Sequence, residues 1–274
     1  MRLQHAGISK SFIVLDMKLH TTSISLAERA NSGLHGHVLD KILELVTDRA
    51  APILDLGCGT GALLAQLRQR GYKDLTGLDI ASPAPAEGVR FVEADLDDCR
   101  STLPDASIRL VVAVEVIEHV ENIGSLLAEL SRVLAPDGQI LMTTPNVHSL
   151  QARIRYLFNA QLKQFDRLGD PTHVYPVFQF PFRRILGRHG LQIIQSWGFP
   201  IGGSSPTSRP SLQALAALAG VLGLRGAPAG DQLCLVLART ADAANERTQT
   251  KQELVTAHYG RLPAAANSTT GQPG

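Results

Sequence analysis

The sequence predicts an α/β fold in which helices cover both faces of a mostly parallel sheet. Short apolar runs typical of buried strands alternate with segments whose apolar residues recur at helical spacing. A glycine-rich stretch, GCGTG at 57–61, separates the first such run from the helix after it. With 274 residues, 44% of them hydrophobic, the chain can build one sizeable core. This alternation of strands and helices indicates βαβ units.

The first half of the chain shows the alternation most clearly. From Gly33 to Val46, apolar residues recur at the spacing of an amphipathic helix. The strands expected after it are 52–56, 74–80, 89–94, 107–116 and 139–144. The helices expected between them are 62–71, which ends on a glycine, and 124–134. We expect the sequence APDG at 135–138 to form a turn before the fifth strand.

The second half is less regular. The expected elements are helices over 147–158 and 177–190, a strand over 191–199, a loop over 200–210, an apolar helix over 212–224 and a last strand over 232–240. We therefore expect a mobile lead-in at 1–32, one domain at 33–240 and a disordered tail at 241–274, whose composition is polar and rich in alanine. Within the domain, 147–190 and 200–230 are expected to be insertions on the side of the fold that receives the substrate (the acceptor side), or lids.

Composition limits the partners and the cellular location that we expect. A net charge of +1 gives no whole-protein field that would attract nucleic acid or an anionic membrane. Cysteines 58, 99 and 234 are scattered without a CxxC pair, and no signal-peptide core is visible, so a cytoplasmic location is expected. The apolar run 212–224 is shorter than the ~20 residues of a membrane span. A peripheral membrane contact through this run stays open.

The glycine loop indicates a ligand site. Gly57, Gly59 and Gly61 lie between a strand and a helix, where the backbone turns tightly and the helix offers free N–H groups. Taken alone, the loop also fits the dinucleotide pattern GxGxxG/A, so a nicotinamide-dependent oxidoreductase (NAD as cofactor) is an alternative.

Three acidic residues favour a different ligand. Asp55 lies two residues before Gly57, where a pyrophosphate would be repelled and a cationic group favoured. Asp79 ends the next strand, 20 residues after Gly59, where a carboxylate can bind ribose hydroxyls. Asp95 follows the third strand. With no Arg or Lys in the loop, this pattern favours a nucleoside that carries a cationic centre.

The segments DLGCGTG, LTGLDI, EADL, EVIEHV and ILMTTPN, in this order and spacing, resemble the class I S-adenosylmethionine-dependent methyltransferases. The resemblance covers roughly residues 33–240. It implies a Rossmann-like, seven-stranded sheet with an antiparallel last strand, and S-adenosyl-L-methionine as cofactor. The cofactor-binding residues that it implies are Asp55, Gly57, Cys58, Gly59, Gly61, Asp79, Ile80, Asp95, Leu96 and Glu115. Asp55 would act through water or order the loop, and both readings are open.

The segment EVIEHV at 115–120 ends the fourth strand, so it is expected near the reactive methyl group. If the acceptor is a hydroxyl, His119 is the best candidate for its base, with Glu118 beside it. In the alternative, His119 only bonds backbone and shapes the pocket.

The same residues also suit a metal. Glu115, Glu118 and His119 form an ExxEH pattern of carboxylate and imidazole ligands, with His173 as a fourth ligand and His148 as its rival. The pattern resembles the O-methyltransferases of ubiquinone biosynthesis and the small-RNA 3′-end ribose methyltransferases. In the alternative without metal, Glu115 meets the methionine amino group and Glu118 faces solvent.

The region 151–190 points to the acceptor. It holds seven basic residues against two acidic ones, and seven of the chain's thirteen aromatic residues. Aromatic faces with interleaved cations suit a flat or apolar acceptor that bears an anionic group, although the same residues would also suit a lid helix packed on the core. We expect O-methylation of a small-molecule, lipid-linked or glycan acceptor. The alternatives are a metal-dependent RNA 3′-end ribose 2′-O-methyltransferase, against which the modest charge counts, the oxidoreductase, and a non-catalytic binding module.

Overall fold

The computed structural model describes residues 33–81, 87–98, 100–167, 169–200, 227 and 229–240. The predicted lead-in at 1–32, the apolar helix at 212–224 and the tail at 241–274 lie outside the described residues. Nearly all of the predicted loop at 200–210 lies outside them too. None of the described helices is long and apolar enough to cross a membrane.

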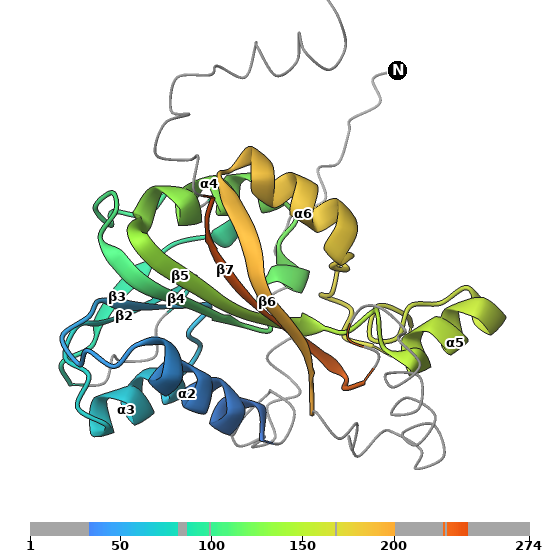
Figure 1. Cartoon of the computed structure of the whole chain (residues 1–274), viewed down its shortest axis with the longest axis horizontal. Coiled ribbons are helices and arrows are strands. Elements are labelled where there is room, and N and C mark those ends of the chain that lie inside the picture. The colour runs from blue at the N-terminus through green and yellow to red at the C-terminus, as the bar shows by residue number, and fades with distance from the viewer. Residues whose placement is uncertain are drawn as a thin grey trace, which may run out of the picture.

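A seven-stranded sheet with the strand order β3-β2-β1-β4-β5-β7-β6 forms the centre of the fold (Figure 1). Its strands are β1 (Ile53–Leu56), β2 (Leu75–Asp79), β3 (Arg90–Glu93), β4 (Ile108–Val114), β5 (Leu134–Pro145), β6 (Leu191–Phe199) and β7 (Gln232–Arg239). Strands β1 to β5 pair in parallel, whereas β7 is antiparallel to both β5 and β6. The predicted fold class, including the antiparallel last strand, is confirmed.

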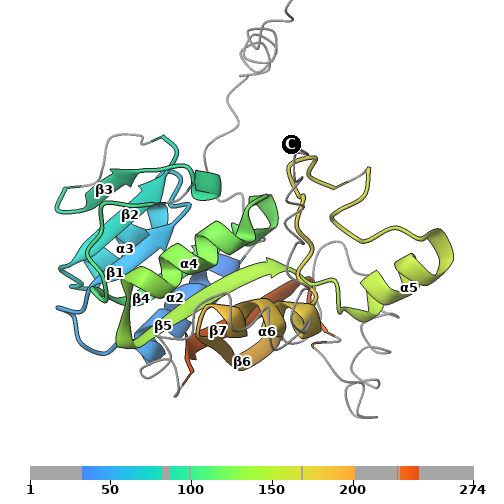
Figure 2. The ribbon, with the colours of Figure 1, turned by 90° about the horizontal axis from the view of Figure 1, so that it is seen from above.

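Helices cover both faces of this sheet. One face packs against α2 (Leu34–Leu45) and α3 (Ala62–Gln69), the other against α4 (Ile123–Val133) and α6 (Gln179–Arg188), as Figures 1 and 2 show. Two single-turn helices, η1 (Leu96–Asp98) and η2 (Ile117–His119), follow β3 and β4. Because β1 lies inside the sheet and is covered on both faces, all four of its residues are buried, Asp55 included, rather than every second one. Helix α5 (Leu150–Asn159) stands away from the sheet in both views.

Strand β5 begins earlier than the sequence predicts. The expected turn at 135–138 is wrong, because β5 starts at Leu134, directly after α4. Leu134 pairs with Ile108, and the next pair joins Gln139 to Leu110, so the extra residues of β5 form a bulge against β4. Turn-forming residues fit such a bulge, since it leaves part of the ladder unpaired.

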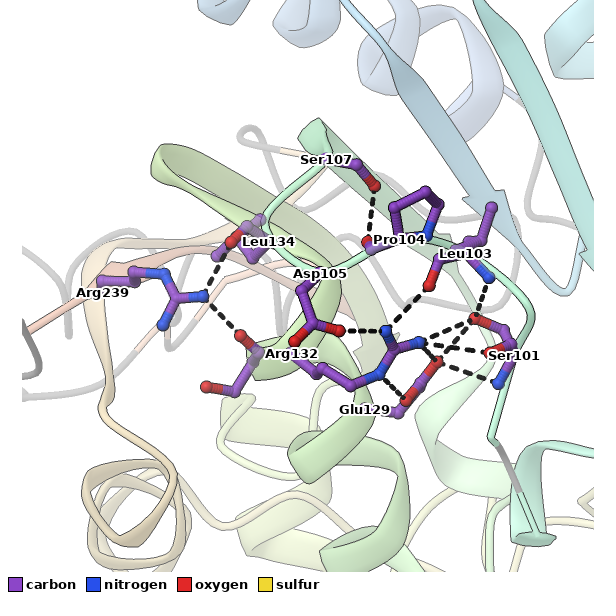
Figure 3. A network of polar contacts seen from close by, with 10 residues as sticks. Ser101, Leu103, Pro104, Asp105, Ser107, Glu129, Arg132, Leu134 and Arg239 are labelled. Carbon is purple, nitrogen blue, oxygen red and sulfur yellow. Dashed lines mark hydrogen bonds and ion pairs between the residues drawn. The ribbon is translucent and has the colours of Figure 1, made fainter. Parts of the chain in front are cut away.

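A buried polar network fixes the end of α4 to the loop before β4 (Figure 3). Arg132 donates to Glu129 Oε1 at 2.6 Å and to the carbonyl of Leu103 at 2.8 Å, and it pairs with Asp105. Ser101 donates to Glu129 through both its hydroxyl and its N–H. Burial alone would raise the pKa of Glu129, but the hydrogen bonds from Arg132 and Ser101 lower it below its usual range. The ionised network therefore stabilises this corner of the fold.

Candidate active site

The carboxyl ends of the parallel strands meet at one edge of the sheet, and the predicted glycine loop lies there. Gly57 follows β1 with φ 66°, and its N–H donates to the carbonyl of Leu78 at 2.7 Å. A Cβ at Gly57 would lie 2.7 Å from Cγ2 of Val116, just after β4. Only glycine satisfies both the positive φ and this close approach, so a side chain at position 57 would displace the loop or Val116.

Asp79 closes the loop from the neighbouring strand. Its Oδ2 accepts the N–H of Gly59 at 2.7 Å, and its Oδ1 accepts the N–H of Ile80 at 2.7 Å. The carboxylate at the end of β2 is thereby held beside the glycine loop, where the sequence places a ribose-binding acid. Cys58 turns the other way and fills the space left by Gly77 on β2. Ile80 is exposed at the same edge.

Asp55 is buried in β1, below the loop. Its carboxyl group is 4% exposed, and burial together with the charge of Asp79 raises its pKa to about 7. A cationic ligand group nearby would oppose both effects and favour the ionised form. This environment suits the amino group that the sequence pattern predicted.

Asp95 and Leu96 follow β3. Asp95 Oδ1 accepts the N–H of Asp97 at 2.9 Å, and Leu96 packs partly on the core. The role of Asp97 was not predicted: its Oδ1 accepts the N–H groups of Glu121 and Asn122, just before α4. This link fixes the segment after β3 to the segment after β4.

Glu115 is the first residue after β4 and has a positive φ of 54°. Such a backbone conformation is costly for a residue with a side chain and is frequent at functional sites. Thr143 of β5 holds it: the N–H of Glu115 donates to Thr143 Oγ1 at 3.1 Å, and the Thr143 hydroxyl donates to Glu115 Oε1 at 2.9 Å. Burial raises the pKa of Glu115 to about 7, although hydrogen bonds from Thr143 and Gln232 oppose the shift.

Glu118 is fully buried in η2, at 0% exposure. The alternative in which it faces solvent is therefore wrong. Neither of its carboxylate oxygens has a hydrogen-bond partner among the described residues; the Thr144 hydroxyl is near enough to favour the charged form but is itself unpartnered. Burial, followed by the charge of Glu115, raises the pKa of Glu118 well above its usual range. A buried carboxylate without a donor is unfavourable unless a cation or a proton accompanies it.

His119 is exposed, and the loop before α6 orients its ring. Its Nδ1 lies 2.8 Å from the hydroxyl oxygen of Thr172, and that hydroxyl donates to Asp170 Oδ1 at 2.6 Å. Burial of part of the ring, followed by the nearby His173, lowers the pKa of His119. The imidazole is therefore favoured in its neutral form, which can accept a proton or bind a metal.

His173 completes a cluster with Glu118 and His119. Each of the three side chains offers one ligand atom, and these atoms lie within 4.8 Å of one another. Glu115, the other predicted ligand, does not belong to this group. His148 is engaged elsewhere, since its Nε2 accepts the N–H of Gln179 at the start of α6. The structure thus brings His173, and not its rival, to the end of β4.

The cluster fits a divalent cation. It combines one carboxylate and two imidazoles, a donor set that suits several divalent metals. His173 Nδ1 lies 2.9 Å from the carbonyl of Gln164, and His119 Nδ1 contacts Thr172, so each ring has an outer partner on its other nitrogen. Metal-binding histidines in proteins usually have such partners. Thr172 and Asp170 were not predicted as part of this site. The sequence feature that could have indicated them is the turn-forming D-x-T directly before His173.

Comparison with known proteins supports the fold described above. Residues 30–196 match a family described as a methyltransferase domain. A malonyl-[acyl-carrier protein] O-methyltransferase of Serratia marcescens is 38% identical over 104 residues, which cover 36% of this chain and 40% of that protein. A ubiquinone biosynthesis O-methyltransferase of Rickettsia prowazekii is 27% identical over 158 residues, covering 53% of this chain and 60% of that protein. The chain thus spans about half the length of the curated relatives that it matches.

Solved structures share the fold at low identity. A SAM-dependent methyltransferase from Archaeoglobus fulgidus superposes with a TM-score of 0.51 and 19% identity, covering 74% of this chain and 93% of that one. A geranyl diphosphate C-methyltransferase from Streptomyces coelicolor gives a TM-score of 0.51 at 12% identity, covering 79% and 85%. The name of the second protein says that it methylates carbon. At this low identity the likeness shows the fold, and it does not indicate which atom this chain would methylate.

Proposed function

Since the chain belongs to the methyltransferase-domain family, we propose that it transfers a methyl group from S-adenosylmethionine to a hydroxyl oxygen of a small-molecule, lipid-linked or glycan acceptor. The observation that carries the proposal is the group formed by Glu118, His119 and His173. It lies just after β4, at the edge of the sheet that also holds the glycine loop. A hydroxyl acceptor needs to lose a proton there, and side chains of this cluster can accept a proton or bind a cation that lowers the pKa of the hydroxyl.

The cofactor would lie along the carboxyl ends of β1 and β2. Gly57 would let the backbone approach the cofactor closely, Asp79 would bind the ribose, and the buried carboxyls of Asp55 and Glu115 would favour a cationic amino group. When bound, S-adenosylmethionine would supply a methyl group on a sulfonium: the acceptor oxygen would bond to the methyl carbon as the carbon–sulfur bond breaks, and S-adenosylhomocysteine would leave. The protein's main contribution is to align oxygen and methyl, which can lower the barrier by several kcal/mol.

We propose that Glu118, His119 and His173 hold a divalent metal ion. The fully buried and unpartnered carboxylate of Glu118 is the main support, because an acceptor-only cluster is satisfied by a cation. When bound, such an ion polarises an acceptor hydroxyl and lowers its pKa. Glu118 and the two imidazoles would hold this ion, and an acceptor hydroxyl whose pKa is lowered in this way would not need a strong base.

The acceptor side is apolar and partly charged. Exposed side chains of Tyr156, Leu157 and Phe158 lie on α5, which follows β5 at the edge of the sheet that carries the site. Two of the basic side chains of this region are neutralised, since Arg155 pairs with Asp166 and Lys163 with Asp231. An apolar acceptor with a small anionic group fits this surface better than RNA, which needs a continuous basic track.

Calorimetry separates the proposal from its alternatives. S-adenosylhomocysteine is expected to bind, and NAD is expected to give no heat above dilution. Binding of NAD without any response to S-adenosylhomocysteine would replace the methyltransferase with an oxidoreductase. Cofactor binding without transfer to any acceptor would indicate a binding module instead.

A further inference from the structure

We propose that Asp170 and Thr172 are positioning residues that hold His119 as the Nδ1–H tautomer, so that its Nε2 keeps a free lone pair. The inference deepens the proposed function, because it assigns the proton arrangement of the same site. It rests on three side chains that come from two separate segments: η2 carries His119, and the loop before α6 carries Asp170 and Thr172.

The tautomer follows from counting protons. A threonine hydroxyl has a single hydrogen to donate and two lone pairs. The Thr172 hydroxyl donates this hydrogen to Asp170 Oδ1 at 2.6 Å. Hydrogen bonds from Thr172 lower the pKa of Asp170, so its carboxylate is ionised and can only accept. Thr172 Oγ1 therefore has only lone pairs left for His119 Nδ1, 2.8 Å away, and Nδ1 is the nitrogen that bears the hydrogen.

The opposite arrangement is unfavourable. If His119 carried its hydrogen on Nε2, the Thr172 hydroxyl would have to donate to Nδ1. Its oxygen would then face the Asp170 carboxylate at 2.6 Å with no hydrogen between the two. The carboxylate cannot easily turn away, because Asp170 Oδ1 also accepts the N–H of Thr172 at 2.9 Å.

His173 is arranged in the same way. Its Nδ1 lies 2.9 Å from the carbonyl of Gln164, which can only accept, so Nδ1 carries the hydrogen there as well. Each histidine thus presents Nε2 as an acceptor, next to the unpartnered carboxylate of Glu118. The N–H groups of Val174 and Tyr175 donate to the carbonyl of Glu118 at 2.8 and 2.9 Å and attach this loop to η2. The loop before α6 therefore determines which ring nitrogen of His119 and of His173 carries the hydrogen.

Nuclear magnetic resonance of ¹⁵N-histidine-labelled, metal-free protein tests the tautomer directly. Correlations from the ring carbon protons to the two ring nitrogens distinguish Nδ1–H from Nε2–H, and His119→Gln identifies the signal of His119. At about pH 8, where unperturbed histidines are neutral, we expect Nδ1–H in the wild type and in Thr172→Ser. We expect a shift toward Nε2–H, the form a histidine prefers in water, in Thr172→Val and Asp170→Ala. His148, whose Nε2 accepts from Gln179, provides an unchanged reference within the same spectra.

Nε2–H at His119 in the wild type, or an identical Nδ1–H signal in Thr172→Val, would overturn the inference. Titration with Co²⁺ gives a second readout: Thr172→Val is expected to bind 10–100-fold more weakly, and Thr172→Ser nearly as well as the wild type. Equal affinity in all three proteins would also count against a positioning role. Failure of the wild type to bind any Co²⁺ would instead overturn the metal part of the proposed function, while the nitrogen signals still decide the tautomer.

Discussion

The ring centroids of His119 and His173 lie 4.8 Å apart, with the ring planes at 72°, although α4, β5, α5 and a long loop separate the two residues in the chain. The contact exists because the segment after His173 bonds to the backbone carbonyl of Glu118. One half of the cluster thus comes from the end of a core strand and the other from a loop attached to it. The loop that borders the acceptor side also completes the site.

Replacing His119 with Gln is expected to lower kcat for methyl transfer by a factor of about 10²–10⁴. The change removes an imidazole that would hold the proposed metal ion or, if no ion is used, the base that takes the acceptor proton. Affinity for S-adenosylhomocysteine should stay near the wild-type value, because the glycine loop is untouched. His148→Gln is the matched control, since His148 lies outside the cluster. Equal losses in the two variants would place the site elsewhere.

Exhaustive chelation, followed by dialysis, is expected to reduce methyl transfer about 10²-fold or more, because a Lewis acid at the acceptor contributes several kcal/mol. Added Mn²⁺ or Mg²⁺ should restore the rate. The same treatment should leave S-adenosylhomocysteine binding unchanged. An unaltered rate after chelation would remove the metal and leave His119 as the general base.

Asp55→Asn is expected to change the pH dependence of stability. The pKa of Asp55 is raised to about 7 in the fold, so protonation favours the folded state, and stability falls as the pH rises toward 7. The variant should unfold at a higher temperature than the wild type above pH 7 and show no such gain near pH 4. Asp74→Asn, at an exposed position, is the control and should not reproduce this gain. Asp55→Asn should also bind S-adenosylhomocysteine more weakly than the wild type, because it lacks the carboxylate charge that favours the amino group of the ligand.

Gly57→Ala is expected to weaken cofactor binding at least ~10-fold, since φ 66° disfavours a side chain and the new Cβ meets Val116 at 2.7 Å. Gly71→Ala is the comparison: its φ is 89°, but no atom lies within 4 Å of the new Cβ and the residue follows α3, away from the site. That variant should lose about 1 kcal/mol of stability and keep its cofactor affinity. Calorimetry and thermal unfolding of both variants provide the check.

Arg132→Met is expected to destabilise the protein by about 3 kcal/mol, because it leaves the buried carboxylate of Glu129 without its cation (Figure 3). Arg109→Met removes a more exposed ion pair with Asp137 and should cost less than about 1 kcal/mol. Denaturant unfolding gives both values. Similar costs for the two variants would contradict the importance assigned to the Glu129 network.

Local sequence patterns were enough to predict the seven strands, the glycine loop and the acid at the end of β2, because each follows from periodicity or from turn residues within a few positions. The start of β5 did not follow, since it depends on the pairing of Leu134 with Ile108 across the sheet. The composition of APDG is typical of a turn, and it forms a bulge only because β5 pairs with β4 on both sides of it.

The site was predictable in its residue types but not in its contacts. Charged residues are rarely fully buried, so nothing in EVIEHV indicated that Glu118 has 0% exposure. His173 was the predicted fourth ligand and His148 its rival, and only the structure shows that His148 Nε2 is engaged by the N–H of Gln179. The contact between Thr172 and His119 joins two distant segments, and spacing along the chain cannot reveal it.

The most direct test of the central claim uses S-adenosylmethionine with a trideuterated methyl group, incubated with the protein and a metabolite and lipid extract. Mass spectrometry then identifies the labelled product and the atom that bears the label. We expect a product methylated on oxygen that forms with the wild type and His148→Gln and is strongly reduced with His119→Gln. A label on carbon or nitrogen, or a yield that does not depend on His119, would contradict the account.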